Sequence, residues 1–320
     1  MAQHTLRSAD QLIERAKAIA HEGRKKRVAV AAAQDVDVIG AVAQAQADGF
    51  IAGVLVGDID SIRELADQHH IDLGKLELVD QKNVTEAAHA AADLAAHDGA
   101  DLIMKGFLPT SALLKTVLDK RHNLRATDTL SHCAVLDIPG YHKLLNFTDG
   151  GMVVKPDVRQ KLAILENAVL VGRALGCNPV KVALSGAVNT PEARMPHTLT
   201  DREEIIPEVA RRMKDVLVQA PVTFDVAVSP DLAAVHRVEG GVAGDADVFL
   251  VDSIEECNIV VKSLIHFAAT IFAGVIVGAR VPVSLVSRTD TVMNKKASLA
   301  LACVLADYYQ QSRIWDQEGV

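Results

Sequence analysis

A short segment near the end of the chain carries residue types suited to binding and transferring an anion. Residues 281–290 read Val-Pro-Val-Ser-Leu-Val-Ser-Arg-Thr-Asp, an apolar strand that runs into polar residues and then into a helix expected over 291–311. Backbone N–H groups at such a helix start are open to a ligand. Arg288 offers a planar fork for phosphate oxygens, Ser287 a hydroxyl donor for a developing oxyanion, and Asp290 a carboxylate. Alternatively, Ser287 only caps the helix, Arg288 pairs with a surface acid, and Asp290 lies in the first turn.

Two further places in the chain fit a charged substrate. Residues 104–110 read as a strand end, a glycine turn and a helix start, so Lys105 could hold a phosphate while Gly106 lets the backbone approach closely. The alternative is a surface lysine beside a routine turn. His132, which follows Ser131, could act as a general acid or base, or could be a buried histidine whose ring is hydrogen-bonded.

Alternating strands and helices must position these groups. Their order along most of the chain is typical of right-handed crossovers and a largely parallel sheet. Of 320 residues, 49% are apolar and only 3% aromatic, as expected when Val, Ala, Leu and Ile fill the core around buried parallel strands. Ligands of such folds bind at the carboxyl ends of strands. The polar residues that follow strands are Lys105 with Gly106 and Thr110, Ser185 to Asn189, Asp225, Asp252 with Asn258, and residues 287–290.

The alternation breaks once, between residues 138 and 156, into segments rich in proline and glycine. This break is the predicted crossing into a second domain. Beyond it we expect a charged helix over 201–218 and strands over 222–224 and 248–251.

Composition excludes several classes of protein. A net charge of −8 without a basic stripe disfavours nucleic acid as a partner. The four cysteines are far apart and none lies in a C-x-x-C pair, which favours a reduced, cytoplasmic chain without a zinc site. The first residues lack the apolar core of a signal peptide, and the longest apolar stretch, 259–279, is interrupted by polar residues and reads as a buried helix and strand rather than a membrane span.

Familiar catalytic motifs are missing from the sequence. It contains no G-x-S-x-G elbow for a serine hydrolase, no H-E-x-x-H or other dense ligand cluster for a metal, and no G-x-G-x-x-G after the first strand for a dinucleotide.

A series of short motifs, in order over about two thirds of the chain, resembles the phosphate acetyltransferase and phosphate butyryltransferase family. The matching pieces are Met104-Lys-Gly with Thr110, Leu130-Ser-His132, Thr148-Asp-Gly, Lys155-Pro-Asp157, Lys161 with Glu166-Asn-Ala168, Met195-Pro196, Phe224 to Ser229, Val242 to Asp247, Asn258 to Lys262, and Ile276 to Pro282 running into Ser287-Arg288.

The resemblance implies a reversible reaction in which acyl-CoA and phosphate give acyl phosphate and CoA. It implies no metal and no prosthetic group, with CoA as a substrate only, and a homodimer or higher homo-oligomer. The implied fold has two α/β domains with mainly parallel sheets flanked by helices and a cleft between them, as in isocitrate and isopropylmalate dehydrogenases. In that fold the last helix returns to the first domain, which gives predicted domains of 1–138 plus 287–320 and 139–286.

The implied site combines a catalytic group with a larger set of substrate-binding residues. The catalytic candidates are Ser287, Arg288 and Asp290. The substrate-binding candidates are Lys105, Gly106, Thr110, Lys115, Ser131, His132, Asn189, Asp225, Asn258 and Lys262.

Ser287-Arg288-Thr289-Asp290 is more similar to the butyryl branch of the family than to the acetyl branch. The acetyl branch typically has glycine after the arginine and an acid several residues later, near Asn294 here. Its glycine- and serine-rich loop is replaced by residues 185–191, and an arginine near Thr110 by Lys115. We therefore expect a phosphate butyryltransferase, with a phosphate acetyltransferase or a non-catalytic CoA-binding relative as the alternatives.

Overall fold

The computed structural model describes residues 4–286 and 290–315, which form two compact units. Unit 1 comprises the residues up to Ala9 and Thr129–Phe272, and unit 2 comprises Asp10–Asp128 and the residues from Ala273 on. The predicted domain boundaries, and the cleft expected between the domains, stay predictions.

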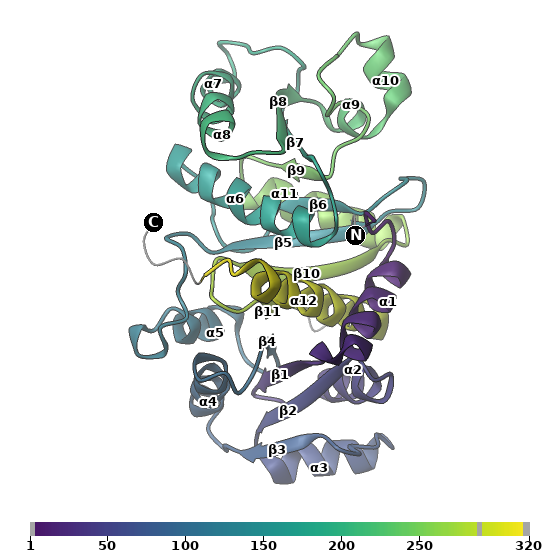
Figure 1. Ribbon diagram of the computed structural model, residues 1–320, viewed down its shortest axis with the longest axis vertical. Coiled ribbons are helices and arrows are strands. Elements are labelled where there is room, and N and C mark those ends of the chain that lie inside the picture. Colours follow the sequence, from purple (N-terminus) through teal and green to yellow (C-terminus); the bar gives the residue numbers. More distant parts are fainter. Residues whose placement is uncertain (1–3, 287–289, 316–320) are drawn as a thin grey trace. The chain divides into compact units, whose positions relative to one another are not determined.

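Unit 2 is built on a mainly parallel sheet with strand order β3-β2-β1-β4-β11-β10 (Figure 1). Only β10 runs antiparallel, against β11. The strands are β1 (Lys26–Ala31), β2 (Ile51–Gly57), β3 (Glu77–Asp80), β4 (Leu102–Lys105), β10 (Ile271–Val277) and β11 (Val283–Ser284). The helices are α1 (Ala9–Ile19), the π-helical η1 (Ala20–Arg24), α2 (Val36–Ala47), α3 (Ile59–Gln68), α4 (Val84–Ala96), α5 (Thr110–Val117), the 3-10 turn η2 (Lys120–His122) and α12 (Val292–Ser312).

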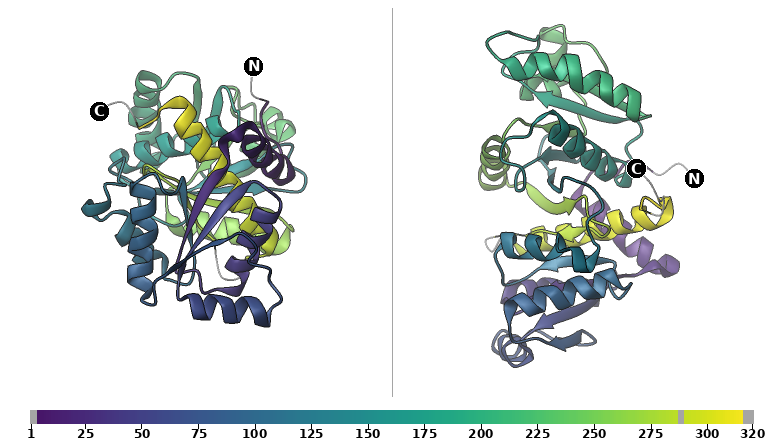
Figure 2. Two further views of the ribbon diagram at one scale, coloured as in Figure 1. Left: turned by 60° about the horizontal axis from the view of Figure 1, so that its bottom comes forward. Right: turned by 90° about the vertical axis from the view of Figure 1, so that its left-hand side faces the viewer.

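Helices cover both faces of the unit 2 sheet. The right-hand view of Figure 2 shows α4 and α5 in front of its strands, while α2 and α12 lie against each other on the opposite face. Alanines Ala87, Ala88, Ala91 and Ala92 form the buried face of α4, so that this helix approaches β1 closely. The interior consists of small aliphatic side chains, as the low aromatic content predicts.

Unit 1 has the sheet order β5-β6-β9-β7-β8, with β5 antiparallel to β6 and the remaining pairs parallel. Its strands are β5 (Ser131–Asp137), β6 (Leu145–Thr148), β7 (Val180–Ser185), β8 (Val216–Val222) and β9 (Val248–Leu250). Its helices are α6 (Val158–Ala174), α7 (Pro196–Thr200), η3 (Asp201–Ile205), α8 (Ile206–Arg212), α9 (Phe224–Val228), α10 (Pro230–Val235) and α11 (Ile254–Phe267). The rings of Phe147, Phe224 and Phe249 pack against one another in tilted and edge-to-face pairs, with ring centroids 5.4–5.7 Å apart.

The predicted fold class, α/β with mainly parallel sheets between helices, is confirmed. Two element predictions in unit 1 are wrong. The break at 138–156 contains a strand, β6, which pairs with β5 and β9. The helix expected over 201–218 ends at Arg212, and Val216–Val222 is strand β8, since its apolar residues pair with β7 instead of continuing the helix.

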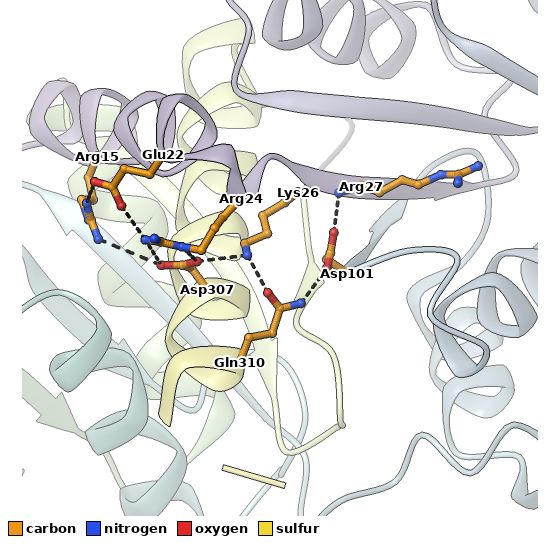
Figure 3. A network of polar contacts seen from close by, with 8 residues as sticks. All are labelled: Arg15, Glu22, Arg24, Lys26, Arg27, Asp101, Asp307 and Gln310. Atoms are coloured by element: carbon orange, nitrogen blue, oxygen red, sulfur yellow. Dashed lines mark hydrogen bonds and ion pairs between the residues drawn. The ribbon is translucent and has the colours of Figure 1, made fainter. Parts of the chain in front are cut away.

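A buried polar network joins α12 to β1 and α1 within unit 2 (Figure 3). The carboxylate of Asp307, only 5% exposed, accepts a hydrogen bond of 2.8 Å from Arg24 Nε and lies 3.0 Å from Lys26 Nζ. Lys26 also donates to Gln310 at 2.6 Å, and Gln310 donates to Asp101 at 2.6 Å. These contacts fix the last helix against the first strand.

Residues 4–286 and 290–315 include no helix that is both long enough and apolar enough to cross a membrane.

Candidate active site

In unit 2, the carboxyl ends of β1, β4 and β11 lie at the same edge of the sheet because these strands are parallel. Lys105 ends β4 with its side chain largely buried, and its Nζ lies 3.3 Å from the carbonyl oxygen of Gly106. The predicted alternative for Lys105, a surface lysine, is therefore wrong.

Gly106 is held against the backbone that follows β1. Its N–H donates to the carbonyl of Ala31 at 2.9 Å, and the N–H of Phe107 donates to Ala32 at 2.6 Å. A Cβ at position 106 would lie 2.1 Å from the carbonyl oxygen of Ala32, so only glycine fits here. The close approach fixes the turn that carries Lys105 to the start of α5.

The starts of α2, α5 and α12 differ in how their first N–H groups are capped. Asp35 caps α2 by accepting from the N–H groups of Asp37 and Val38, and Thr291 caps α12 by accepting from Asn294. Pro109, which precedes Thr110 at the start of α5, forms no side-chain cap within the described residues. The first N–H groups of α5 are thus suited to an anionic ligand. Lys115 is exposed on the same helix.

Asp290 lies next to a buried lysine that the sequence reasoning missed. Lys295 Nζ donates to the backbone carbonyl of Asp290 at 2.5 Å and lies 3.7 Å from a carboxylate oxygen of Asp37, with only 1% of its side chain exposed. Lys295 is followed by Lys296 early in the helix, and two adjacent lysines there are typical of a solvent-exposed face. Nothing in the sequence therefore indicated that Lys295 is buried. Ser287 and Arg288 lie outside the described residues, and their predicted roles stay predictions.

In unit 1, the first residues of β5 lie beside the loop that follows β6. The Asp149 carboxylate accepts four hydrogen bonds from backbone N–H groups. One comes from His132 of β5 at 3.2 Å, and three come from the loop itself, from Gly151 at 2.8 Å, Met152 at 3.0 Å and Val153 at 3.1 Å. Burial nevertheless raises the pKa of Asp149 to about 6. The sequence signals for this loop were the Thr148-Asp-Gly motif and the proline- and glycine-rich break over 138–156.

The His132 ring lies against the backbone of Gly150 and Gly151, where an added Cβ would come within 3.5 Å of ring atoms. The residue is 7% exposed, and neither ring nitrogen has a hydrogen-bond partner among the described residues. Burial lowers the pKa of His132 to about 4, so that the imidazole is neutral at pH 7. The expected burial is found, but the expected ring hydrogen bonds are not seen in the described part of the chain.

The other predicted residues of unit 1 fall into separate groups. Ser131 is fully buried, and its hydroxyl accepts from Asn167 at 2.9 Å. Asn189 and Asp225 meet at Thr223, whose hydroxyl lies 3.3 Å from the Asn189 amide oxygen and 2.5 Å from the Asp225 carboxylate. The Thr223 hydroxyl and the N–H of Val226 lower the pKa of Asp225.

Asn258 and Lys262 are exposed on α11, one helical turn apart. Helix α11 lies over the Asp149 loop, since a Cβ at Gly150 would be 2.9 Å from Cys257 Sγ. Helix α11 and the His132 ring thus both lie against the Asp149 loop.

A buried charged cluster in unit 1 was also missed. Lys161 Nζ donates to Asp201 at 2.7 Å and to Asp252 at 2.5 Å, and His197 lies 3.3 Å from Asp252. Its members are spread over some ninety residues of sequence, so spacing alone could not group them.

Comparisons with known proteins identify the family of the chain. Residues 81–303 match the family described as "Phosphate acetyl/butaryl transferase". The chain is 39% identical to the probable phosphate butyryltransferase of Bacillus subtilis (strain 168), over 89% of this chain and 95% of that protein. It is 32% identical to the phosphate acetyltransferase of Thermotoga maritima, over 93% of this chain and 99% of the other.

The chain belongs to the phosphate acetyl/butyryl transferase family. A branched-chain phosphotransacylase from Enterococcus faecalis V583 also matches in structure, with a TM-score of 0.78 and 28% identity over 88% of this chain and 99% of that one. The predicted family is confirmed, and the chain is an enzyme of the acyltransferase class. The roles predicted for single residues of the site are not tested by these comparisons and stay predictions.

Proposed function

We propose that this enzyme moves a short-chain acyl group reversibly between CoA and inorganic phosphate and that it prefers butyryl to acetyl groups. The observation that carries the proposal is the family match over residues 81–303, together with 39% identity to a butyryltransferase against 32% to an acetyltransferase. The Ser-Arg-Thr-Asp segment at 287–290 supports the butyryl preference.

The reaction follows from holding two substrates together. An oxygen of hydrogen phosphate attacks the thioester carbonyl carbon, and the carbon–sulfur bond then breaks. The proton that the phosphate loses is balanced by the one that the departing CoA thiolate takes up. Binding both substrates in one site removes much of the entropic barrier to their meeting. In this proposal Arg288 holds phosphate, Ser287 stabilises the oxyanion of the tetrahedral state, and Asp290 takes the CoA thiol proton in the reverse direction.

Lys105, Lys115 and the N–H groups of α5 supply positive potential for phosphate or CoA oxygens at the carboxyl edge of unit 2. The neutral His132 ring is available to hydrogen-bond a polar substrate group, because no described residue occupies either nitrogen. Asn258 and Lys262 on α11 are candidates for contacts with CoA.

We also propose that the reaction needs no metal or prosthetic group and that the enzyme is a cytoplasmic homodimer. Four free cysteines, all buried, support a reducing compartment. On α11, Ile259 is 65% exposed and Phe267 is 84% exposed, an apolar face that a second copy would cover. Light scattering should give a mass of about twice 34.2 kDa, and a mass equal to one chain contradicts the dimer.

Thiol release with phosphate and acetyl-, propionyl- or butyryl-CoA tests the proposed preference. The kcat/KM should be highest for butyryl- or propionyl-CoA. A tenfold advantage for acetyl-CoA would show the acetyltransferase alternative to be right. CoA binding without release from any of the three thioesters would instead show a non-catalytic relative.

A further inference from the structure

Three potential metal ligands meet in unit 2, outside the residues assigned to acyl transfer. His89 lies on α4, Asp119 caps the 3-10 turn η2, and His122 ends that turn; one ligand atom of each lies within 4.8 Å of the others. His89 and His122 are 33 residues apart, so the search for a local ligand motif could not find them.

The cluster lies toward the amino edge of the unit 2 sheet, whereas Lys105 and Gly106 lie at the carboxyl edge. His122 lines a cavity of about 500 Å³ together with Ala100 and Asp101, which precede β4, and Pro282, which precedes β11. A ligand bound at the cluster would therefore be separate from the proposed phosphate site of this unit.

A hydrogen bond to a carboxylate fixes the orientation and tautomer of the His122 ring, as is common for histidines that bind metal ions. Its Nδ1 lies 2.7 Å from a carboxylate oxygen of Asp93, which can only accept, so the proton is on Nδ1. The Nε2 lone pair then points at His89 Nδ1, 2.8 Å away. A carboxylate that fixes the tautomer of a histidine in this way is the usual second partner of a metal-bound imidazole. The His122 side chain is 1% exposed, so this orientation is rigidly held.

The guanidinium of Arg121 bridges the other ring nitrogen of His89, Nε2, and the Asp119 carboxylate. Arg121 donates to His89 Nε2 at 2.5 Å, and its Nε lies 3.1 Å from the Asp119 carboxylate. The Arg121 side chain is 56% exposed and is free to swing into solvent. A tetrahedral zinc ion holds two nitrogens roughly 3.3 Å apart at Zn–N distances of about 2.0–2.1 Å. The imidazoles therefore need to separate by only about half an ångström, while the His89 proton moves from Nδ1 to Nε2.

We propose that His89, Asp119 and His122 bind a divalent transition-metal ion of the zinc type, with Asp93 orienting His122 and water completing the tetrahedron. The ion replaces the guanidinium of Arg121 as the countercharge of Asp119. It links α4 to the segment after α5, and so stabilises unit 2 without entering the acyl-transfer reaction. This inference does not rest on the proposed function.

Metal titration of chelator-treated, full-length protein tests the site. Calorimetry with Zn²⁺ should give one site per chain, and Co²⁺ should give the visible absorption bands of a four-coordinate ion. His89→Ala and Asp119→Asn should each weaken Zn²⁺ binding at least tenfold, and Asp93→Asn about tenfold through the orientation of His122. His69→Ala, on the exposed end of α3, is the matched control and should bind as the unchanged chain does.

Circular dichroism of each metal-free variant verifies that it is folded. Neither ligand variant replaces the buried His122, so a folding defect is not expected to obscure the result. Failure of the unchanged chain to bind Zn²⁺ more tightly than about 100 µM overturns the proposal. So does a loss of less than tenfold in either ligand variant, or a loss in His69→Ala equal to theirs.

Discussion

At the scale of single residues, His132 combines deep burial with ring nitrogens that contact no hydrogen-bond partner in the described part of unit 1. A buried polar group without a partner costs free energy, so it persists where a ligand or a function compensates. The neutral ring beside the Asp149 loop is therefore a stronger candidate for substrate contact than Ser131, whose hydroxyl is already bonded to Asn167.

The lowered pKa of His132 predicts a specific loss of stability in acid. Its pKa is about 4 in the folded chain and about 6.5 when unfolded. Below pH 6.5 the unfolded chain takes up a proton that the folded chain does not, so stability falls as the pH decreases toward 4. At pH 5 this amounts to about 2 kcal/mol.

Urea unfolding of the unchanged chain and of His132→Gln, at pH 7 and pH 5, measures the effect. The unchanged chain should lose about 2 kcal/mol more than the variant between these pH values. Asp149 has a raised pKa, so its protonation stabilises the folded chain as the pH falls, opposite to the effect of His132. This contribution is the same in both proteins and cancels when their losses of stability are compared. Equal losses in the two proteins would mean that His132 titrates normally.

Substitutions of Arg288 and Ser287 should affect KM and kcat differently, since Arg288 is proposed to bind phosphate and Ser287 to stabilise the transition state. Arg288→Ala removes a preorganised donor to phosphate and should cost roughly 3–4 kcal/mol, a hundred- to thousandfold in rate, with KM for phosphate raised as well. Arg288→Lys should recover only part, because an ammonium cannot make the bidentate contact. Ser287→Ala should chiefly lower kcat. Steady-state kinetics measure all three, and changes within about twofold for Arg288→Ala would show that it is only a capping or surface residue.

Residues that follow strands were predictable from the sequence, but clusters assembled by the fold were not. Lys105 ends β4 as expected, because the carboxyl edge of a parallel sheet is a topological feature that the strand pattern reveals. The strand expected over 222–224 is wrong, since β8 ends at Val222 and Asp225 lies in the first turn of α9. The Lys161–Asp201–Asp252 cluster and the His89–His122 pair depend on which helices lie next to each other. The spacing of residues along the chain does not show which helices will be neighbours in the fold.

At the scale of elements, strands in irregular sequence were harder to predict than those within the alternating pattern. Strand β6 is four residues long and lies in a segment rich in glycine and proline, so it shows too little periodicity. Strand β8 begins only three residues after the charged helix α8. Its Gln219 and Pro221 interrupt the apolar pattern that would indicate a buried strand. Both are held by pairing with neighbours, a tertiary effect that outweighs local propensity.

The attachment of α12 depends on Asp307. Replacing this carboxylate by Asn leaves Lys26, whose side chain is only 3% exposed, without the negative charge it pairs with, although the hydrogen bond to Gln310 stays. Breaking such a buried pair should cost about 2–4 kcal/mol. Asp128→Asn is the matched control, because Asp128 pairs with Arg125 in full solvent and should give no measurable change. Thermal unfolding compares the two, and equal melting temperatures would show that the network contributes little.

At the scale of the whole molecule, the family match covers parts of both compact units, residues 81–128 and 273–303 in unit 2 and 129–272 in unit 1. The predicted site is likewise drawn from both units, with Lys105, Thr110 and Asp290 in one and His132, Asn189 and Lys262 in the other. Neither unit alone carries the full set, so we expect the activity to need the complete chain.

In the proposed reaction the acyl group passes from CoA to phosphate rather than to water. Phosphorus-31 NMR of the enzyme with butyryl-CoA and inorganic phosphate tests this transfer directly. We expect a new acyl phosphate resonance that grows in step with free CoA, and no CoA release when phosphate is omitted. Release of CoA at the same rate without phosphate, or without an acyl phosphate signal, would contradict it.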